Sequence, residues 1–245
     1  MEWRDEGIVV GVRRHGESSV LLELMTRYHG RHLGLVRGGR SARMQPVLQP
    51  GNGVEATWRA RLEDQLGTYT VEGTTLRAGE LMGSAAALYG LGHIGQLLRL
   101  LPERDPHPAL YEALPIVLGA LGEPRAAGAL MVRFEIALLA ELGVGLDLSA
   151  CAVTGGHEDL AFVSPKSGRA VSRDAAGPWL DRLLVLPPFL HEGQGRAWPS
   201  RDDIAAGFAL TGHFLARNVY EARGLAPPDT RAAFVAAVLA REGDG

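Results

Sequence analysis

The periodicity of apolar residues changes near residue 79 of the chain. Before that point, apolar runs are short and are separated by glycine-containing or polar turns. In the segment 53–61, for example, Val54, Ala56 and Trp58 alternate with polar residues, and a period of two predicts a half-buried strand. The expected strands comprise residues 8–12, 20–26, 31–36, 53–61 and 67–71. Because no helical segment separates them, we expect a small antiparallel barrel.

Helical periodicity dominates after residue 79. Between residues 80 and 101, apolar or small residues recur every three or four positions, which predicts an amphipathic helix. The expected helices comprise residues 80–101, 108–121, 126–142, 177–186, 202–223 and 229–241. A hairpin with a long turn at 164–169 interrupts this pattern. We therefore predict an α+β fold, with a barrel domain at 1–78 and a mostly helical domain at 79–245 that contains a small β-hairpin.

The composition is that of a folded protein without a membrane span. The 245 residues are 46% hydrophobic and 22% charged, and no window of about 18 residues is continuously apolar. A single cysteine, Cys151, excludes a disulfide framework. The formal net charge is −3, yet residues 25–61 contain seven arginines and only one acid, Glu55. Such a basic segment suits a polyanion such as nucleic acid, although a solvated strand-and-loop face would look the same.

One short motif indicates an enzyme. Arg14-His15-Gly16-Glu17 follows an apolar strand, as the nucleophilic histidine of histidine phosphatases does. That fold alternates strands with helices, whereas here strand follows strand for about 70 residues. No phosphate-binding loop, serine-hydrolase elbow, zinc-protease motif or dinucleotide fingerprint is present. The phosphatase reading remains as an alternative to a non-catalytic protein without a cofactor.

The order of features resembles the RecO family of bacterial DNA repair proteins, which are recombination mediators. The resemblance runs from residue 7 to about residue 190, and its most specific part is Leu146-Asp147-Leu148-Ser149-Ala150-Cys151-Ala152-Val153-Thr154-Gly155. It implies an N-terminal OB-fold, a helical C-terminal domain, and binding of single- and double-stranded DNA with annealing of complementary strands. It also implies loading of RecA, together with RecR, onto DNA coated by single-strand binding protein. The expected location is the cytoplasm, at the nucleoid.

Within this resemblance, the basic segment supplies the candidate DNA contacts. The arginines would track phosphates, and Tyr28 is the best candidate for stacking on a base, whereas Trp58 and Tyr69 are expected in the core. The candidate DNA-binding residues are Arg13, Arg14, Arg27, Tyr28, His29, Arg31, Arg37, Arg40 and Arg43. An adaptor whose basic patch meets only an acidic partner tail is the third hypothesis.

The acidic C-terminal tail of single-strand binding protein is expected on the helical domain. Such a tail needs an apolar slot with a cation at its rim, and the segment 126–142 offers Arg133 among Leu130, Phe134 and Ala137. The alternative is that Arg133 is a buried or half-buried structural residue, for example paired with Glu141.

Many relatives carry a four-cysteine zinc site in the helical domain, and here the resemblance implies its loss. The matching positions are Cys151, Thr154, Ser172 and Ala175, within a segment of about 151–175. One thiolate and two hydroxyls do not form a structural zinc site, so we expect no metal. The hairpin should instead be held by apolar packing of Phe162, Val163 and Val171.

Overall fold

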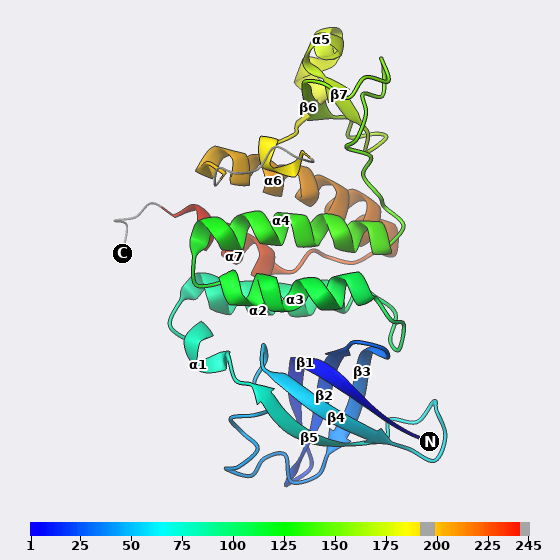
Figure 1. The fold of residues 1–245 in the computed structure, drawn as a ribbon, viewed down its shortest axis with the longest axis vertical. Helices are drawn as coiled ribbons and strands as arrows, with labels where there is room; N and C mark the ends of the chain where they lie inside the picture. Colours follow the sequence, from blue (N-terminus) through cyan, green and yellow to red (C-terminus); the bar gives the residue numbers. More distant parts are fainter. Residues whose placement is uncertain (192–198, 241–245) are drawn as a thin grey trace. The chain divides into compact units, whose positions relative to one another are not determined.

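A computed structural model describes residues 1–191 and 199–240 of the chain. The chain forms two compact units, Met1–Gly122 and Glu123–Gly245. Figure 1 shows a β-barrel with three helices in the first unit, and helices with a small sheet in the second. The fold is therefore α+β, as the sequence predicts. Within the described residues, no helix has the length and apolar character that a membrane crossing requires.

Five strands close the barrel of the first unit in the order β1-β2-β3-β5-β4. They are β1 (Glu2–His15), β2 (Ser19–Thr26), β3 (Gly30–Val36), β4 (Gly53–Arg59) and β5 (Thr68–Thr75). All neighbours are antiparallel except β3 and β5, which meet in parallel at Leu35 and Thr68. This five-stranded barrel is that of an OB-fold. Strand β1 is longer than predicted, because its first half pairs with β4 and its second half with β2.

The inner face of the barrel is filled by alternate residues of each strand. On β2, Val20, Leu22 and Leu24 point into the core. Trp58 and Tyr69 are also buried, with 1% and 4% of their surface exposed, which confirms their predicted place in the core. The Tyr69 ring fits because Gly34 has no side chain; a Cβ there would lie 2.4 Å from Cδ2 of the ring.

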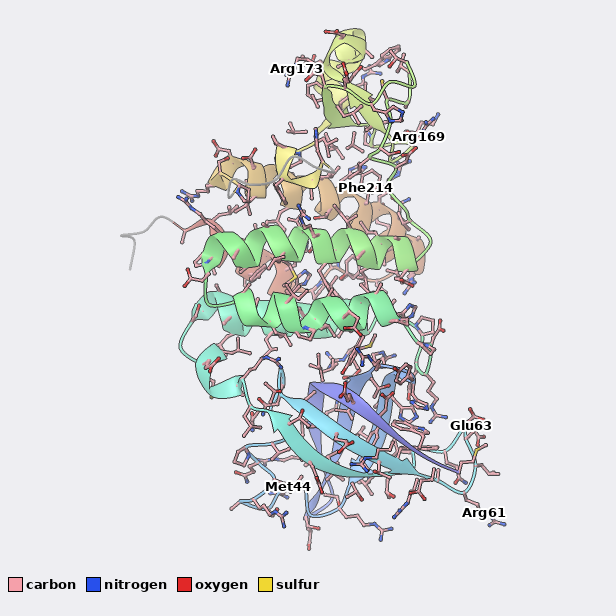
Figure 2. All side chains as sticks on the ribbon, in the orientation of Figure 1. Met44, Arg61, Glu63, Arg169, Arg173 and Phe214 are labelled. Carbon is pink, nitrogen blue, oxygen red and sulfur yellow. The ribbon has the colours of Figure 1, made fainter. Side chains whose placement is uncertain are left out.

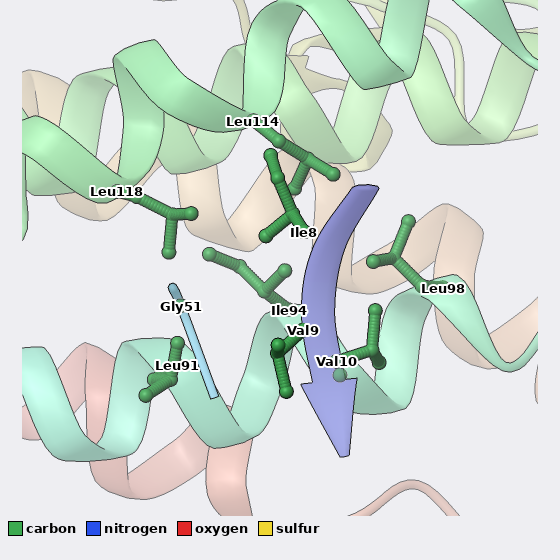
Figure 3. Close-up of a pocket in the computed structure, with 10 residues that line it drawn as sticks. Ile8, Val9, Val10, Gly51, Leu91, Ile94, Leu98, Leu114 and Leu118 are labelled. Carbon is green, nitrogen blue, oxygen red and sulfur yellow. The ribbon is translucent and has the colours of Figure 1, made fainter. Parts of the chain in front are cut away.

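Three helices complete the first unit: α1 (Ala78–Leu81), α2 (Ala85–Leu98) and α3 (Pro108–Ala120). The single helix predicted for 80–101 is thus divided in two, because Ser84 caps a new start by accepting a hydrogen bond from the Ala87 N–H at 3.3 Å. Apolar side chains of β1, α2 and α3 close around a cavity of only about 10 Å³ (Figure 3). This close packing fixes the helices against β1.

The second unit is built around α4 (Pro124–Glu141), α6 (Arg201–Phe214) and α7 (Asp229–Leu239). A π-helical segment, Leu215–Tyr220, and a short 3₁₀ helix, Glu221–Arg223, continue α6, so the predicted helix 202–223 is not α-helical throughout. The carboxylate of Glu135 on α4 is fully buried and forms a bidentate ion pair with Arg231 of α7, at 2.8 and 3.0 Å. This buried pair ties the two helices together.

A small sheet in the order β7-β6-β8 also belongs to the second unit. Strands β6 (Leu160–Val163) and β7 (Ala170–Ser172) form the predicted hairpin, with Val163 and Val171 buried and Phe162 half-buried, and the short helix α5 (Arg173–Ala176) follows. The α-helix predicted for 177–186 is wrong. The segment forms a 3₁₀ helix, Gly177–Arg182, and then β8 (Leu184–Val185), which pairs with β6. A short apolar run is compatible with helix and strand alike, and here the pairing with β6 decides for a strand.

Candidate nucleic-acid interface

The β1–β2 turn and the exit of β3 lie at the same end of the barrel. The register pairs Arg14 with Val20, and Val20 in turn with Val36, so the chain leaves β3 at Arg37 beside the β1–β2 turn. Arg13 and Arg14 precede that turn, and both are exposed. Two stretches of chain that carry arginines thus meet at one edge of the sheet.

The loop that follows β3 is anchored to the barrel. Leu48 is 3% exposed and belongs to the barrel core, and Met44 packs against it. Figure 2 labels Met44 on the side of the barrel away from helices α2 and α3 of the same unit. Gly39 crosses directly over the core, since a Cβ there would lie 2.5 Å from Cγ2 of Val20. The loop therefore covers the barrel end with apolar side chains and leaves its arginines outside.

Asn52 holds the loop after β3 and the segment after β5 together through hydrogen bonds of its side chain. Its side chain is fully buried, and its Nδ2 donates to the carbonyls of Pro46 and Val47 at 2.8 and 3.1 Å. Its Oδ1 accepts from the N–H groups of Arg77 and Ala78 at 2.9 and 3.0 Å. One side chain thus clips the loop to the segment that leaves β5.

We call Arg13, Arg14, Arg37, Arg40 and Arg43 the loop-end arginines. All five are exposed. Arg40 donates to the Gly16 and Glu17 carbonyls at 3.4 and 2.5 Å and thereby joins the two loops. Within residues 1–191 and 199–240, no ion pair or hydrogen bond engages the side chains of the other four. Segments 13–19 and 37–49 contain a single acid, Glu17, so the surface is strongly positive.

The β2–β3 turn is at the other end of β2, and the basic residues there are paired with acids. There the guanidinium of Arg27 pairs with Glu112 of α3 and lies 3.7 Å from Glu6. The Glu112 carboxylate accepts its hydrogen bond and raises the pKa of Arg27. The Asp5 carboxylate accepts from the Tyr28 N–H at 2.8 Å and contacts Nδ1 of His29 at 2.9 Å. Carboxylates thus already engage both Arg27 and the ring of His29.

Tyr28 itself is 67% exposed, as a stacking residue should be. It lines an open groove of about 560 Å³ together with Arg4, Asp5, Glu6, Arg27 and Glu55. Arg4 pairs with Glu55 in this groove. Three carboxylates and two paired arginines make a poor surface for a polyanion.

Arg31 is held inside the first unit. Its side chain is only 13% exposed, and its Nη1 donates to Oε1 of Glu23 at 2.9 Å. Arg99, at the end of α2, donates to Oε2 of the same carboxylate at 2.6 Å. Glu23 is 5% exposed, so both cations are needed to satisfy a buried charge. Arg31 is therefore engaged in packing β3 and β2 against α2.

His15, the nucleophile in the phosphatase alternative, is exposed in the hairpin turn at the end of β1. The surrounding fold is a barrel of consecutive strands, not the layered α/β structure which that chemistry requires. The phosphatase alternative thus lacks its scaffold.

The residues expected to receive a partner tail lie on α4. Arg133 is exposed, and its guanidinium donates to the carbonyl of Phe189, so it makes a structural contact without the burial that the alternative expects. Leu130 and Ala137 are half-buried, whereas Phe134 is 2% exposed and faces the core. Phe134 is therefore not available on the surface to line a slot beside Arg133.

The positions that match a zinc site do not fit a metal. Sγ of Cys151 accepts hydrogen bonds from N–H and Oγ of Ser172 at 3.3 and 3.4 Å. Burial raises the pKa of the thiol, but hydrogen bonds from Ser172 and Thr154 outweigh it and lower the pKa to about 6. Ala175 offers no ligand, and the described residues contain no group of three His, Cys, Asp or Glu side chains able to hold a metal ion. The sulfur of Cys151 is thus hydrogen-bonded by neighbouring residues instead of being held as a ligand in a four-cysteine zinc site.

Comparison with known proteins identifies the family. A family model described as "Recombination protein O N terminal" matches residues 1–76, and one described as "Recombination protein O C terminal" matches residues 82–224. The chain belongs to the RecO family. Proteins named DNA repair protein RecO are similar to it over nearly their whole length. That of Chelativorans sp. (strain BNC1) is 61% identical over 239 residues, which cover 98% of this chain and 96% of that protein.

Two further RecO relatives agree. The protein of Methylobacterium nodulans is 62% identical over 96% of this chain and 97% of its own length, and that of Rhizobium etli (strain CIAT 652) is 58% identical over 98% and 93%. Membership of the RecO family supports a role in DNA repair and recombination, as a mediator and not as a known catalyst.

Proposed function

We propose that this protein binds DNA through the loop-end arginines and acts as a recombination mediator. The observation that carries the proposal is the gathering of five exposed arginines, two from the end of β1 and three from the anchored loop after β3, at one end of an OB-fold barrel. Guanidinium groups without partners can neutralise phosphates and release counterions, which gives affinity without sequence preference. Arg27, His29 and Arg31 are left out of this surface because carboxylates already engage them.

The proposed activity includes annealing of complementary strands. Two strands approach each other more readily when arginines screen their phosphates. Family membership adds the expectation that the protein loads RecA, together with RecR, onto DNA coated by single-strand binding protein. It also adds docking of that protein's acidic tail beside Arg133 of α4. Because the proposed substrate is DNA, we place its action at the nucleoid, in the cytoplasm.

A charge-removal experiment tests the DNA site. The triple variant Arg14→Gln, Arg37→Gln, Arg43→Gln removes three exposed cations without touching Arg40, which joins the loops. We expect the slope of log K against log salt on single-stranded DNA to flatten by about 2, since each lost phosphate contact is worth about 0.7.

The matched control removes three exposed arginines elsewhere on the barrel. These are Arg4, which pairs with Glu55, Arg59, which pairs with Glu2, and Arg61 of the β4–β5 loop, labelled in Figure 2. If the control variant weakens DNA binding as much as the loop-end variant does, the DNA-binding site does not lie at the loop-end arginines. No binding by the parent protein in low salt would favour the adaptor hypothesis, in which the arginines meet only an acidic protein tail.

A further inference from the structure

We propose that the loop-end arginines recognise the phosphodiester backbone alone and leave the bases free to pair. This inference rests on the proposed DNA-binding function and specifies which part of the nucleic acid the surface contacts. It differs from the usual mode of OB-folds on single strands, in which bases stack on aromatic side chains.

The aromatic side chains of the barrel are occupied by one another. Trp3 stacks on His29 with ring centroids 4.0 Å apart and also lies against Trp58 at 5.7 Å. His32 meets the rings of Trp58 and Tyr69 edge-on, at 5.1 and 5.8 Å. Because Trp58 and Tyr69 are buried, these ring faces cannot accept a nucleobase.

The exposed Tyr28 is too far from the arginines to act with them at a single nucleotide. It lies two residues after Thr26, the last residue of β2, whereas the loop-end arginines lie around the first. The eight residues of β2 make seven steps of about 3.3 Å, so the two ends of the strand lie about 23 Å apart. The carboxylates of Asp5, Glu6 and Glu55 around Tyr28 also repel phosphates.

The loop segments themselves contain almost no stacking surface. Residues 13–19 and 37–49 include no Phe, Tyr or Trp, and their one aromatic ring is the imidazole of His15. A strand on this surface therefore meets guanidinium groups and little else. Its bases keep their hydrogen-bonding edges exposed, so a complementary strand can pair without displacing the protein. Backbone recognition thus supplies what annealing requires.

Oligonucleotides with and without bases test the inference. We would compare oligodeoxythymidylate with an abasic oligomer of the same number of phosphates, by fluorescence anisotropy on the full chain at low salt. We expect the two dissociation constants to agree within about threefold. Loss of even one stacked base would weaken binding by about fivefold or more. The Arg14, Arg37, Arg43 triple variant should weaken both polymers by the same factor, and Tyr28→Ala should weaken neither.

Chemical probing of the bound strand gives an independent reading. Thymines of the bound oligomer should stay as reactive to permanganate as in free DNA. An abasic oligomer that binds at least about fivefold more weakly, or thymines that become protected, would overturn the backbone-only inference and leave the proposed DNA binding intact. If neither polymer binds, the proposed function itself fails, and this inference fails with it.

Discussion

His32 makes the barrel sensitive to acid. Its ring is 2% exposed inside the barrel, and its Nδ1 lies 2.9 Å from the Tyr69 hydroxyl. Burial, reinforced by the positive charge of Arg104, lowers the pKa of His32 from 6.5 to about 4. The folded state therefore keeps the imidazole neutral at a pH at which the unfolded chain is protonated.

The magnitude follows from this difference. Because the pKa is lower in the folded state, the contribution of His32 to stability is complete above pH 6.5 and is lost as the pH falls from 6.5 towards 4. At pH 5, which is about 1.5 units below the unfolded-state pKa, protonation of His32 stabilises the unfolded chain but not the folded barrel. At 1.36 kcal/mol per unit, this lowers the free energy of unfolding by about 2 kcal/mol.

The assay is urea unfolding at pH 7.5 and pH 5, followed by tryptophan fluorescence. Trp3 and Trp58 lie 5.0 and 5.1 Å from the His32 ring and report on the barrel. Other groups titrate in the same range, so the informative quantity is the difference between the parent and His32→Gln. The variant should lose about 2 kcal/mol less between the two pH values. The matched control is His15→Gln, which removes an exposed histidine and should behave as the parent does.

A variant that loses as much stability at pH 5 as the parent would refute this reasoning. Should His32→Gln fail to fold, NMR titration of the parent decides the matter. An imidazole of His32 that becomes protonated near pH 6.5 in the folded protein would contradict the burial argument directly.

The second unit offers four further tests. Purified protein should contain no stoichiometric zinc by elemental analysis, and one zinc per chain would contradict the hydrogen-bonded account of Cys151. The pKa of that thiol is lowered from 9.0 to about 6, so its contribution to stability is complete only above pH 9 and is lost as the pH falls from 9 to 6. Cys151→Ala should therefore lower the melting temperature more at pH 8 than at pH 6. Glu135→Gln leaves the Arg231 guanidinium without its buried carboxylate. It should lower the free energy of unfolding of the second unit by about 3 kcal/mol, measured in urea. A loss below about 1 kcal/mol would show that the ion pair is dispensable. Arg133→Ala removes an exposed side chain with one backbone acceptor, so it should cost about 1 kcal/mol of stability yet raise the dissociation constant of an acidic tail peptide tenfold or more; a stable variant with unchanged affinity removes Arg133 from the tail site.

The barrel could be predicted from sequence because its strands carry a clear period of two. The inward row Val54, Ala56 and Trp58 is visible in the sequence and is buried in the structure. The segment 177–186 was predicted wrongly for a physical reason. Its apolar run is compatible with both helix and strand, and only the open edge of β6, formed by a distant part of the chain, decides in favour of β8.

The candidate site was predictable in composition but not in arrangement. Arg27, Arg31, Arg37, Arg40 and Arg43 belong to one basic segment in the sequence, yet the two ends of β2 separate them into exposed and paired groups. The paired group depends on acids far along the chain, such as Glu112 on α3. One signal was present. Glu23 is the only charged residue of β2 and stands among Leu22, Leu24 and Met25. A buried acid at that place requires a cation on a neighbouring element, here Arg31 and Arg99.

The four hydrogen bonds of Asn52 have a kinetic consequence. They hold the arginine loop in shape before any ligand arrives, so the loop has little ordering to do on contact. Association should then be limited by encounter and by the attraction between arginines and phosphates, with a rate constant that rises as the ionic strength falls. Asn52→Ala releases the loop at Pro46 and at Arg77, and in stopped-flow mixing it should slow association with DNA while the salt dependence of the rate stays the same.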